Sequence, residues 1–249
     1  MRKIRILKAI LLVFSLAIII YFISEFVKYK FATSIVNTTT SIDFAKLRND
    51  GKIHIVIDAG HGGPDPGARN FKLNIFEKDI ARKVVDAVMS MIDTTKYTVL
   101  ETRPKDSNIH RHSRIDLANK FKTDLLISFH CNAFTGGYLN GVEIHLSDST
   151  LNVKDSTSKL NPHKKINIGF ADTLSKNIAG VFPDMKRNGV VNRKDRIWII
   201  YAGDFPSVLV EWSYINNEKD IAIMQDPVAH QVLARAVWHS INQHFGFEK

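Results

Sequence analysis

The chain has 249 residues, of which 45% are hydrophobic and 24% are charged, as in ordinary globular proteins. Its formal net charge is +9, but residues 1–30 alone contain six Lys or Arg and one Glu. No basic cluster with interleaved aromatic residues stands out elsewhere, which argues against a nucleic-acid partner. Cys131 is the only cysteine and excludes an internal disulfide bond. It adjoins His130 on a predicted strand, where neighbouring side chains point to opposite faces. If His130 faces a site, we expect Cys131 to face the core.

The N-terminal segment is basic and then apolar. Residues 9–24 are uncharged, and the wider run 6–27 approaches the ~20 residues that span a bilayer. We predict a signal-anchor, or alternatively a cleaved signal peptide, at residues 1–30 and a polar linker at 31–50. One folded domain is expected at 51–249, and either alternative sends it out of the cytoplasm.

The folded part begins with an apolar strand at 53–57 and a glycine-rich loop at 60–67. In the helix predicted at 76–92, apolar residues recur at intervals of three and four, which gives one buried stripe. A second strand is predicted at 97–100.

A helix at 113–121 comes next, with Ser113 as its expected N-cap. The strand predicted at 125–130 is apolar almost throughout, as expected for a strand covered on both faces. The segment 142–146 alternates apolar and polar residues, which predicts a strand nearer the edge of the sheet.

The stretch 147–165 is polar and loop-like, and a helix is predicted at 168–181. Two more strands are predicted at 197–201 and 208–211, before a closing helix at 228–245. Strands that alternate with helices predict an α/β fold, with a mostly parallel mixed sheet of about six strands flanked by helices.

Four polar side chains fall along one edge of this predicted sheet. His61, His130 and Glu211 lie at or just after the C-terminal ends of strands, where α/β proteins gather their sites, and Glu77 opens a helix. Two imidazoles and one carboxylate with an open fourth position are typical of catalytic zinc. A second carboxylate, such as Glu211 on its rigid apolar strand, could then take and return a proton.

Each residue also has an ordinary structural interpretation. His61 could be a simple loop residue, and Glu77 could stabilise a helix N-terminus without any metal. His130 could be a hydrogen-bonded core residue, and Glu211 could form a structural salt bridge. Glu143 and His145 are a reserve pair with the same chemistry, expected at the surface.

Six segments carry motifs in a fixed order along the chain. They are IDAGHGGPDPGA at 57–68, FEKD at 76–79, Thr102-Arg103, Arg114 with Ala118-Asn119, SFHCNA at 128–133, and PSVLVE at 206–211 with INN at 215–217. Over roughly residues 52–245, the chain resembles the zinc-dependent N-acetylmuramoyl-L-alanine amidases of bacterial cell-wall turnover.

The resemblance implies that His61, Glu77 and His130 bind Zn²⁺ and that Glu211 is the catalytic carboxylate. The implied reaction is hydrolysis of the amide between the lactyl group of N-acetylmuramic acid and L-alanine in peptidoglycan, for cell-wall remodelling or cell separation. Zinc lowers the pKa of its bound water to about 7 and polarises a carbonyl oxygen, which suits this reaction.

Two further residues, Asn132 and Arg114, are expected to bind substrate. Trp212 stands where the family has a smaller residue, so we expect it to narrow the groove. Some relatives insert a blocking helix near the segment that corresponds to 147–165. This segment is short and poor in apolar residues here, so an open site is expected.

Residues 51–249 would then be the amidase catalytic domain, in a periplasmic or other extracytoplasmic part of the cell envelope and anchored to the inner membrane by residues 1–30. The expected partners are peptidoglycan and the membrane, and a protein activator is also compatible with the sequence. No nucleic-acid partner is expected. Two other functions stay open, namely a zinc peptidase that cuts within the stem peptide and a non-catalytic peptidoglycan-binding module.

Overall fold

The computed structural model describes residues 14–21, 23, 50–147, 163–193 and 197–248. The chain divides into two units, Met1–Ile42 and Asp43–Lys249. In the first unit, the described residues are helical. Within the described parts of the chain, none of the helices has both the length and the apolar character needed to cross a membrane. Most of the predicted membrane segment and almost all of the predicted linker lie outside the described residues.

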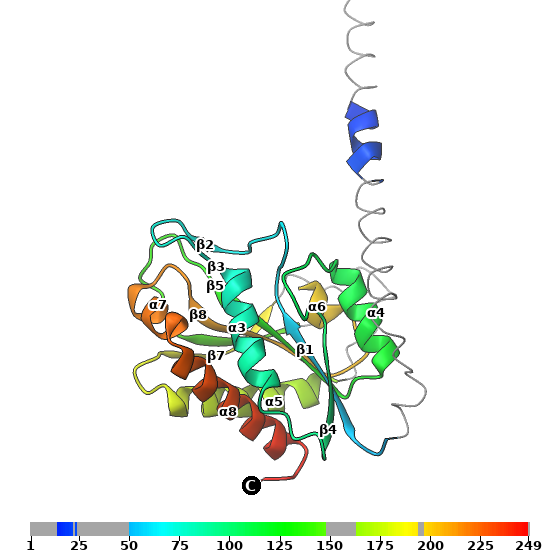
Figure 1. The fold of residues 1–249 in the computed structure, drawn as a ribbon, viewed down its shortest axis with the longest axis vertical. Coiled ribbons are helices and arrows are strands. Elements are labelled where there is room, and N and C mark those ends of the chain that lie inside the picture. The colour runs from blue at the N-terminus through cyan, green and yellow to red at the C-terminus, as the bar shows by residue number, and fades with distance from the viewer. Residues whose placement is uncertain (1–13, 22, 24–49, 148–162, 194–196, 249) are drawn as a thin grey trace, which may run out of the picture. The chain divides into compact units, whose positions relative to one another are not determined.

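A six-stranded sheet organises the second unit, with the strand order β4-β1-β5-β8-β6-β7 (Figure 1). Neighbouring strands are parallel except for β6 and β8, which are antiparallel. The mostly parallel α/β fold predicted from the sequence is therefore confirmed. The strands are β1 (Ile53–Ala59), β4 (Tyr97–Glu101), β5 (Leu125–Asn132), β6 (Val142–Ser147), β7 (Arg187–Arg193) and β8 (Ser207–Tyr214), with a separate hairpin of β2 (Arg69–Asn70) and β3 (Ile75–Phe76).

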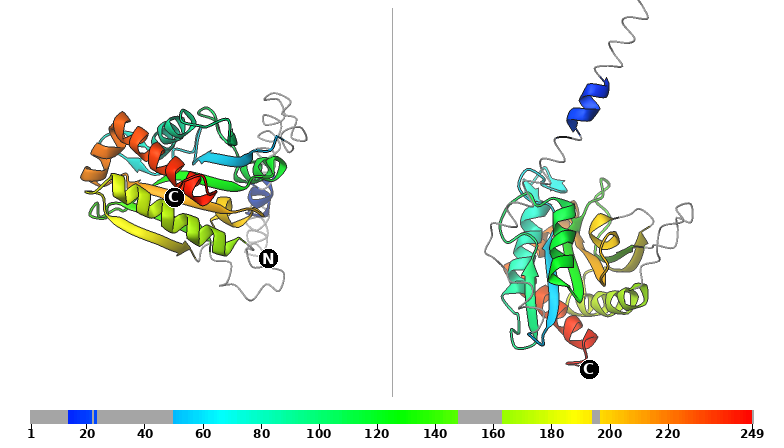
Figure 2. Two further views of the ribbon diagram at one scale, coloured as in Figure 1. Left: turned by 90° about the horizontal axis from the view of Figure 1, so that it is seen from below. Right: turned by 90° about the vertical axis from the view of Figure 1, so that its right-hand side faces the viewer.

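Helices cover both faces of the sheet (Figure 2). One face carries α3 (Glu77–Met89), α5 (Lys164–Val181) and α8 (Pro227–His244). The other face carries α4 (Arg111–Phe121) and the short α6 (Trp198–Tyr201). Between β8 and α8 lies α7 (Glu218–Gln225).

Alternate residues along the strands divide the core into two clusters. On β1, Ile55 and Ile57 belong to the larger cluster and Val56 to the smaller one. Successive side chains of a strand point to opposite faces, so the sheet is buried on both sides. Cys131 lies in the larger cluster and is 2% exposed, which confirms the prediction that it faces the core. Burial raises the pKa of its thiol well above the ordinary value.

The edge of the sheet beyond β6 differs from the prediction. The segment 197–201 is not a strand, because Trp198–Tyr201 forms the helix α6 and buries Ile199 and Ile200 against the smaller cluster. The edge strand is instead β7, Arg187–Arg193, whose sequence RNGVVNR is too polar to predict a strand. The strand β6 is therefore second from the edge.

The start of α4 also differs from the prediction. Ser113 is not the N-cap but a buried residue inside the helix. The helix begins at Arg111, and the N-cap is His110, whose Nδ1 accepts a hydrogen bond from the backbone N–H of His112 at 3.4 Å. An imidazole nitrogen here takes the role that serine, threonine or aspartate fills more often.

Candidate metal and catalytic site

His61 lies in the loop after β1, in a backbone conformation that non-glycine residues seldom adopt. Its φ is +59°, and the two glycines that follow also have positive φ. Its Nδ1 lies 2.9 Å from Asp65 Oδ2, and its Nε2 lies 3.0 Å from Glu77 Oε1. A carboxylate on one ring nitrogen fixes the orientation of the imidazole and leaves the other nitrogen for a metal.

Glu77 is the first residue of α3 and is 4% exposed. Its Oε2 accepts a hydrogen bond from the backbone N–H of Ala68 at 2.7 Å, and its Oε1 accepts one from the N–H of Cys131 at 3.1 Å. The same Oε1 lies 2.8 Å from His130 Nδ1. One ligand atom from each of His61, Glu77 and His130 lies within 4.8 Å of the others.

Two glycines leave the space that these three groups occupy. A Cβ at Gly60 would overlap the imidazole ring of His130. A Cβ at Gly67, where φ is +66°, would lie 2.5 Å from Glu77 Oε2 and 2.6 Å from His61 Cδ2. The loop can therefore enclose the cluster only with glycine at these positions.

The electrostatics of the cluster couple the three groups. Burial lowers the pKa of His61, but the hydrogen bonds and charges of Glu77 and Asp65 outweigh it and raise that pKa to about 9. The pKa of His130 is also raised, because the hydrogen bond and charge of Glu77, together with the charge of Glu211, outweigh burial. Burial raises the pKa of Glu77, but the two imidazoles hold it well below its ordinary value. The cluster thus attracts positive charge, as protons or as a cation.

Glu211 lies beside this cluster on β8. It is the register partner of His130 on β5, and paired residues of neighbouring strands face the same side of a sheet. Its Oε2 is buried and has no hydrogen-bond partner among the described residues, and burial raises the pKa of the carboxyl to about 7. An unpartnered buried oxygen argues against a structural salt bridge and leaves the carboxylate free to meet a substrate.

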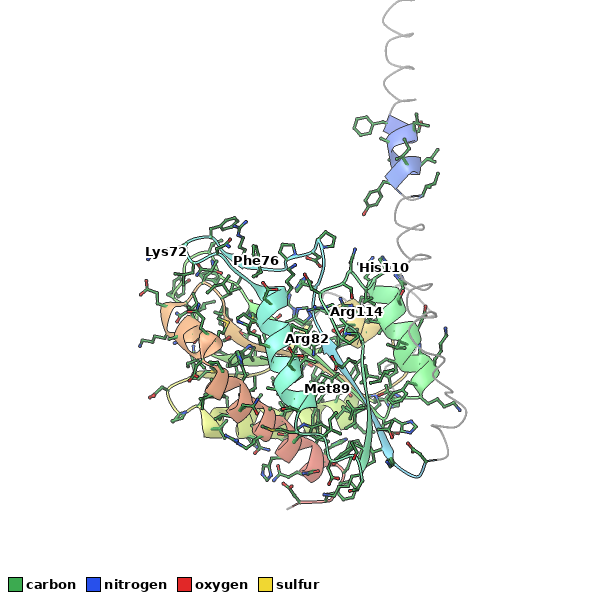
Figure 3. The ribbon with its side chains drawn as sticks, in the orientation of Figure 1. Lys72, Phe76, Arg82, Met89, His110 and Arg114 are labelled. Carbon is green, nitrogen blue, oxygen red and sulfur yellow. The ribbon has the colours of Figure 1, made fainter. Side chains whose placement is uncertain are left out.

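Arg114 is buried between α4 and the loop after β1, in a different environment from the one expected. It is 7% exposed and reaches from α4 to the loop after β1 (Figure 3). Its guanidinium donates to Asp58 Oδ1 at 2.7 Å and to the carbonyl oxygens of Ala59, His61 and Ile109. These contacts hold the loop in place, so they favour a positioning role over the expected contact with substrate.

A second buried arginine supports the same loop. Arg103 is 1% exposed and donates to the carbonyl oxygens of Ala59 and Gly60, both at 3.1 Å. Together with Arg114, it binds three successive carbonyl groups that lead up to and include His61. The motif Thr102-Arg103 was visible in the sequence, but no local pattern indicated that its guanidinium would bind this loop.

Asn132 and Trp212 were both expected to lie at the substrate groove. Asn132 is the last residue of β5 and is half-buried, so that it can meet a substrate. Trp212 is 0% exposed and lies in the larger core cluster on the opposite face of the sheet. The expectation that Trp212 narrows the groove is therefore wrong. The open site was expected because the segment 147–165 lacks a blocking helix, and residues 148–162 of that segment lie outside the described residues.

The reserve pair Glu143 and His145 is not on the surface. His145 is 2% exposed, and Glu143 is half-buried and is the register partner of Glu211. The alternation along β6 places both side chains on the face of Glu211. The sequence contained this alternation, but it did not indicate that the antiparallel partner of β6 would be β8.

Comparison with known proteins places these motifs in a family. Residues 55–243 match the model of the family described as Amidase_3, N-acetylmuramoyl-L-alanine amidase. The N-acetylmuramoyl-L-alanine amidase AmiC of Escherichia coli is 25% identical over 80% of this chain, and the match spans about half, 54%, of that protein.

Two solved structures share the fold. The catalytic domain of CwlV, an N-acetylmuramoyl-L-alanine amidase from Bacillus (Paenibacillus) polymyxa, has a TM-score of 0.67 and 24% identity and covers 78% of this chain and 98% of its own. The CwlD amidase from Clostridioides difficile, solved in complex with the GerS lipoprotein, has a TM-score of 0.68 and 22% identity, over 79% of this chain and all of its own. With the family match across three quarters of its length, the chain belongs to the N-acetylmuramoyl-L-alanine amidases, hydrolases of cell-wall peptidoglycan.

Proposed function

We propose that this chain is a zinc-dependent amidase that cleaves the bond between the lactyl group of N-acetylmuramic acid and L-alanine, with Glu211 as its catalytic carboxylate. The observation that carries the proposal is the convergence of His61, Glu77 and His130 beside Glu211. These four residues come from separate elements and meet at the carboxyl edge of a parallel sheet, where α/β enzymes hold their sites.

The three converging residues suit Zn²⁺. Two imidazole nitrogens and one carboxylate oxygen are a common ligand set for catalytic zinc and leave a fourth position open. His61 would use Nε2, because Asp65 engages its Nδ1, and His130 would use Nδ1, the nitrogen that faces Glu77. Zn²⁺ supplies Lewis acidity, which polarises a carbonyl group and makes water a nucleophile at neutral pH.

Glu211 would move the proton in this hydrolysis. The water oxygen forms a bond to the lactyl carbonyl carbon, and the carbon–nitrogen bond to L-alanine breaks. Glu211 takes one proton from the attacking water and gives it to the leaving amine, and the second proton of the water is released when the new acid ionises. The products are a lactyl carboxylate and a free stem peptide. Its buried Oε2 has no partner among the described residues and is available for this transfer.

Arg114 would act through the loop and not on the substrate. Together with Arg103, it fixes the backbone that carries His61, and these hydrogen bonds keep the imidazole in place for a metal. Asn132 would contact the substrate, since it is half-buried and stands two residues beyond His130 on β5.

We also propose that residues 1–30 are a membrane anchor, 31–50 a linker and 51–249 the catalytic domain. The basic start and apolar run of the sequence support this division. Peptidoglycan lies outside the cytoplasm, so the catalytic domain would act there from the inner membrane. The lipoprotein bound to CwlD supports a protein partner for this chain as well.

The test is digestion of purified peptidoglycan by the full-length protein, with zinc content measured in parallel. Mass spectrometry should find free stem peptides that begin with L-alanine, and His130→Ala should lose both zinc and product. His239→Ala, which removes an exposed imidazole on α8, should keep both. Fragments that keep L-alanine on the lactyl group would instead indicate a peptidase. Wild-type protein without zinc or product would indicate a binding module.

A further inference from the structure

A polar cluster lies next to Glu211, and its members Glu143, His145 and Tyr214 have no part in the reaction described above. Glu143 on β6 is the register partner of Glu211 on β8, which is in turn the partner of His130 on β5. Paired residues of adjacent strands face the same side of the sheet. The three side chains therefore form a row across β5, β8 and β6, and Glu143 lies in the wall of the site.

A β-bulge brings a fourth side chain to this face. Between the paired positions, β8 advances three residues from Glu211 to Tyr214, while β5 advances two from His130 to Asn132. The extra residue reverses the alternation of side chains along β8. Tyr214 therefore turns to the site, where its hydroxyl donates to Glu143 Oε1.

Three donors hold the carboxylate of Glu143. In addition to the Tyr214 hydroxyl on Oε1, its Oε2 lies 2.8 Å from His145 Nε2 and accepts from Asn132 Nδ2 at 3.2 Å. His145 and Tyr214 are 2% and 4% exposed. Their hydrogen bonds outweigh burial and hold the pKa of Glu143 below its ordinary value. Glu143 is thus an ionised acceptor in a fixed position.

Glu143 also settles the orientation of the Asn132 amide. The backbone N–H of Ala133 donates to Asn132 Oδ1 at 2.9 Å, and Nδ2 donates to Glu143. A backbone N–H cannot accept and a carboxylate cannot donate, so the amide cannot be reversed. Glu143 accepts a hydrogen bond from one of the two N–H groups on Nδ2. The other N–H group has no acceptor among the described residues and can donate to a substrate.

We propose that Glu143 is a positioning residue that fixes Asn132 so that Nδ2 donates to a carbonyl oxygen of the substrate beside the scissile amide. This inference rests on the proposed function. Asn132 stands two residues, or about 7 Å of strand, beyond His130, which is within the reach of one substrate unit. An N–H donor selects an acceptor, and a substrate amine or hydroxyl hydrogen would not fit there.

The carbonyl oxygen could belong to the stem peptide or to the acetamido group of the sugar, which share this chemistry. Two substrates separate them, a muramoyl peptide with its acetamido group and a lactoyl peptide without the sugar. If the effect of Asn132→Ala on KM persists on the lactoyl peptide, the acceptor is a peptide carbonyl. If the effect is confined to the muramoyl peptide, the acceptor is the acetamido carbonyl.

The test is a double-mutant cycle in the full-length, zinc-loaded protein, with Glu143→Gln, Asn132→Ala and the double variant. We expect Glu143→Gln to raise KM about tenfold and to change kcat by less than about threefold, as loss of one substrate hydrogen bond does. In the Asn132→Ala background, Glu143→Gln should add almost nothing to KM, because it acts through Asn132. Effects that add, or a kcat that falls at constant KM, would overturn the proposal.

Two further variants serve as an alternative test and as a control. If Glu143→Gln fails to fold, Asn132→Asp keeps Glu143 and replaces the donor with an acceptor. It should raise KM at least as much as Asn132→Ala does, and a wild-type KM would count against the proposal. Glu248→Gln is the matched control, because Glu248 also pairs with a histidine and an asparagine, at the end of the chain. It should leave KM unchanged.

The failure of this inference can be told apart from the failure of the proposed function. If wild-type protein binds zinc and releases stem peptides while Glu143→Gln keeps the wild-type KM, only the role of Glu143 is wrong. If wild-type protein releases no stem peptide, the proposed function itself fails, and the inference fails with it.

Discussion

Glu211 combines two properties that a structural glutamate seldom has. Its Oε2 is buried without a hydrogen-bond partner among the described residues, and burial raises the pKa of its carboxyl to about 7. Holding such a group in the folded protein costs free energy, because burial removes its hydration. The cost has a physical explanation if the carboxyl exchanges protons with a substrate.

The variant Glu211→Gln keeps the size of the side chain and removes its ability to carry a proton. We expect kcat for stem-peptide release to fall by about 10²–10⁴-fold. The midpoint of thermal unfolding should stay the same or rise, since a neutral amide is less costly to bury than a carboxylate. Zinc content should stay at the wild-type level, and a variant that retains half of the wild-type kcat would contradict the assigned role.

Asp58 illustrates a different use of buried charge. Burial raises its pKa, but the guanidinium of Arg114 and the hydroxyls of Ser128 and Thr102 outweigh this and lower it to about 2. A lowered pKa in the folded state stabilises the protein above the ordinary pKa of 3.8. This contribution should be lost as the pH falls from 3.8 through about 2.

Asp58→Asn should therefore lower the free energy of unfolding at pH 7 by about 3–5 kcal/mol, because it leaves the buried Arg114 without a charged partner. Urea unfolding at pH 7 and pH 3 measures the effect, and the difference from wild type should shrink at pH 3. Asp172→Asn, at an exposed ion pair on α5, should cost about 1 kcal/mol or less. Equal costs for the two variants would contradict this assignment.

At the scale of elements, the segment between β1 and α3 does most to build the site. It carries His61 and leads to Glu77, the first residue of α3, and the two buried arginines hold its carbonyl groups. Gly60 lets this segment pass beside the His130 ring. We predict that Gly60→Ala displaces that ring and lowers zinc affinity by about tenfold or more, as loss of ligand orientation does.

Zinc affinity by competition with a chelator checks the Gly60→Ala prediction. Gly169→Ala is the control, because a Cβ at this position of α5 meets no atom within 4 Å. It should keep zinc affinity and stabilise the helix by about 0.5–1 kcal/mol. Wild-type zinc affinity in Gly60→Ala would show that the contact between Gly60 and His130 is not needed.

The sequence predicts those elements whose own residues determine them. The apolar runs of β1 and β5 and the amphipathic stripe of α3 have strong local periodicity, and these three elements are confirmed. The strand β7 has little apolar signal of its own, since it lies at the edge and pairs only with β6. The apolar run of α6 fits a strand or a helix equally well, and its packing against β8 and α4 is a contact with distant segments that local periodicity does not show.

In the candidate site, too, some features follow from local sequence and others from contacts between distant segments. The motifs around His61, Glu77 and His130 predicted that these residues would meet, because each lies at the end of a predictable element. The role of Glu143 depends on the antiparallel pairing of β6 with β8, which is a contact between distant segments. Such a contact cannot be read from local periodicity, and for this reason Glu143 was expected at the surface.

At the scale of the whole molecule, the three proposed metal ligands would link metal binding to the fold. His61 follows β1, Glu77 begins α3 and His130 lies on β5, so the site exists only when these elements are assembled. A ligand that binds only the folded state stabilises it, by about 2.7 kcal/mol at one hundred times its dissociation constant. For a domain of this size, the corresponding rise in the unfolding midpoint is roughly 5–10 °C.

This stabilisation should depend on pH with a definite sign. Without metal, the pKa of His61 in the folded state is about 9, above its ordinary value of 6.5. A raised pKa stabilises the fold fully below pH 6.5, and this contribution is lost as the pH rises through 9. Zinc needs deprotonated imidazoles, so its binding strengthens over the same interval.

We therefore expect the difference in unfolding midpoint between zinc-loaded and chelator-treated protein to grow from pH 6 to pH 9. Thermal unfolding in a series of buffers measures it. His130→Ala should abolish the difference at every pH, because one ligand is missing. Glu211→Gln should retain both the difference and its rise with pH, because Glu211 is not one of the three converging ligands. A difference that stays constant or falls with pH would show that zinc does not replace protons on these imidazoles.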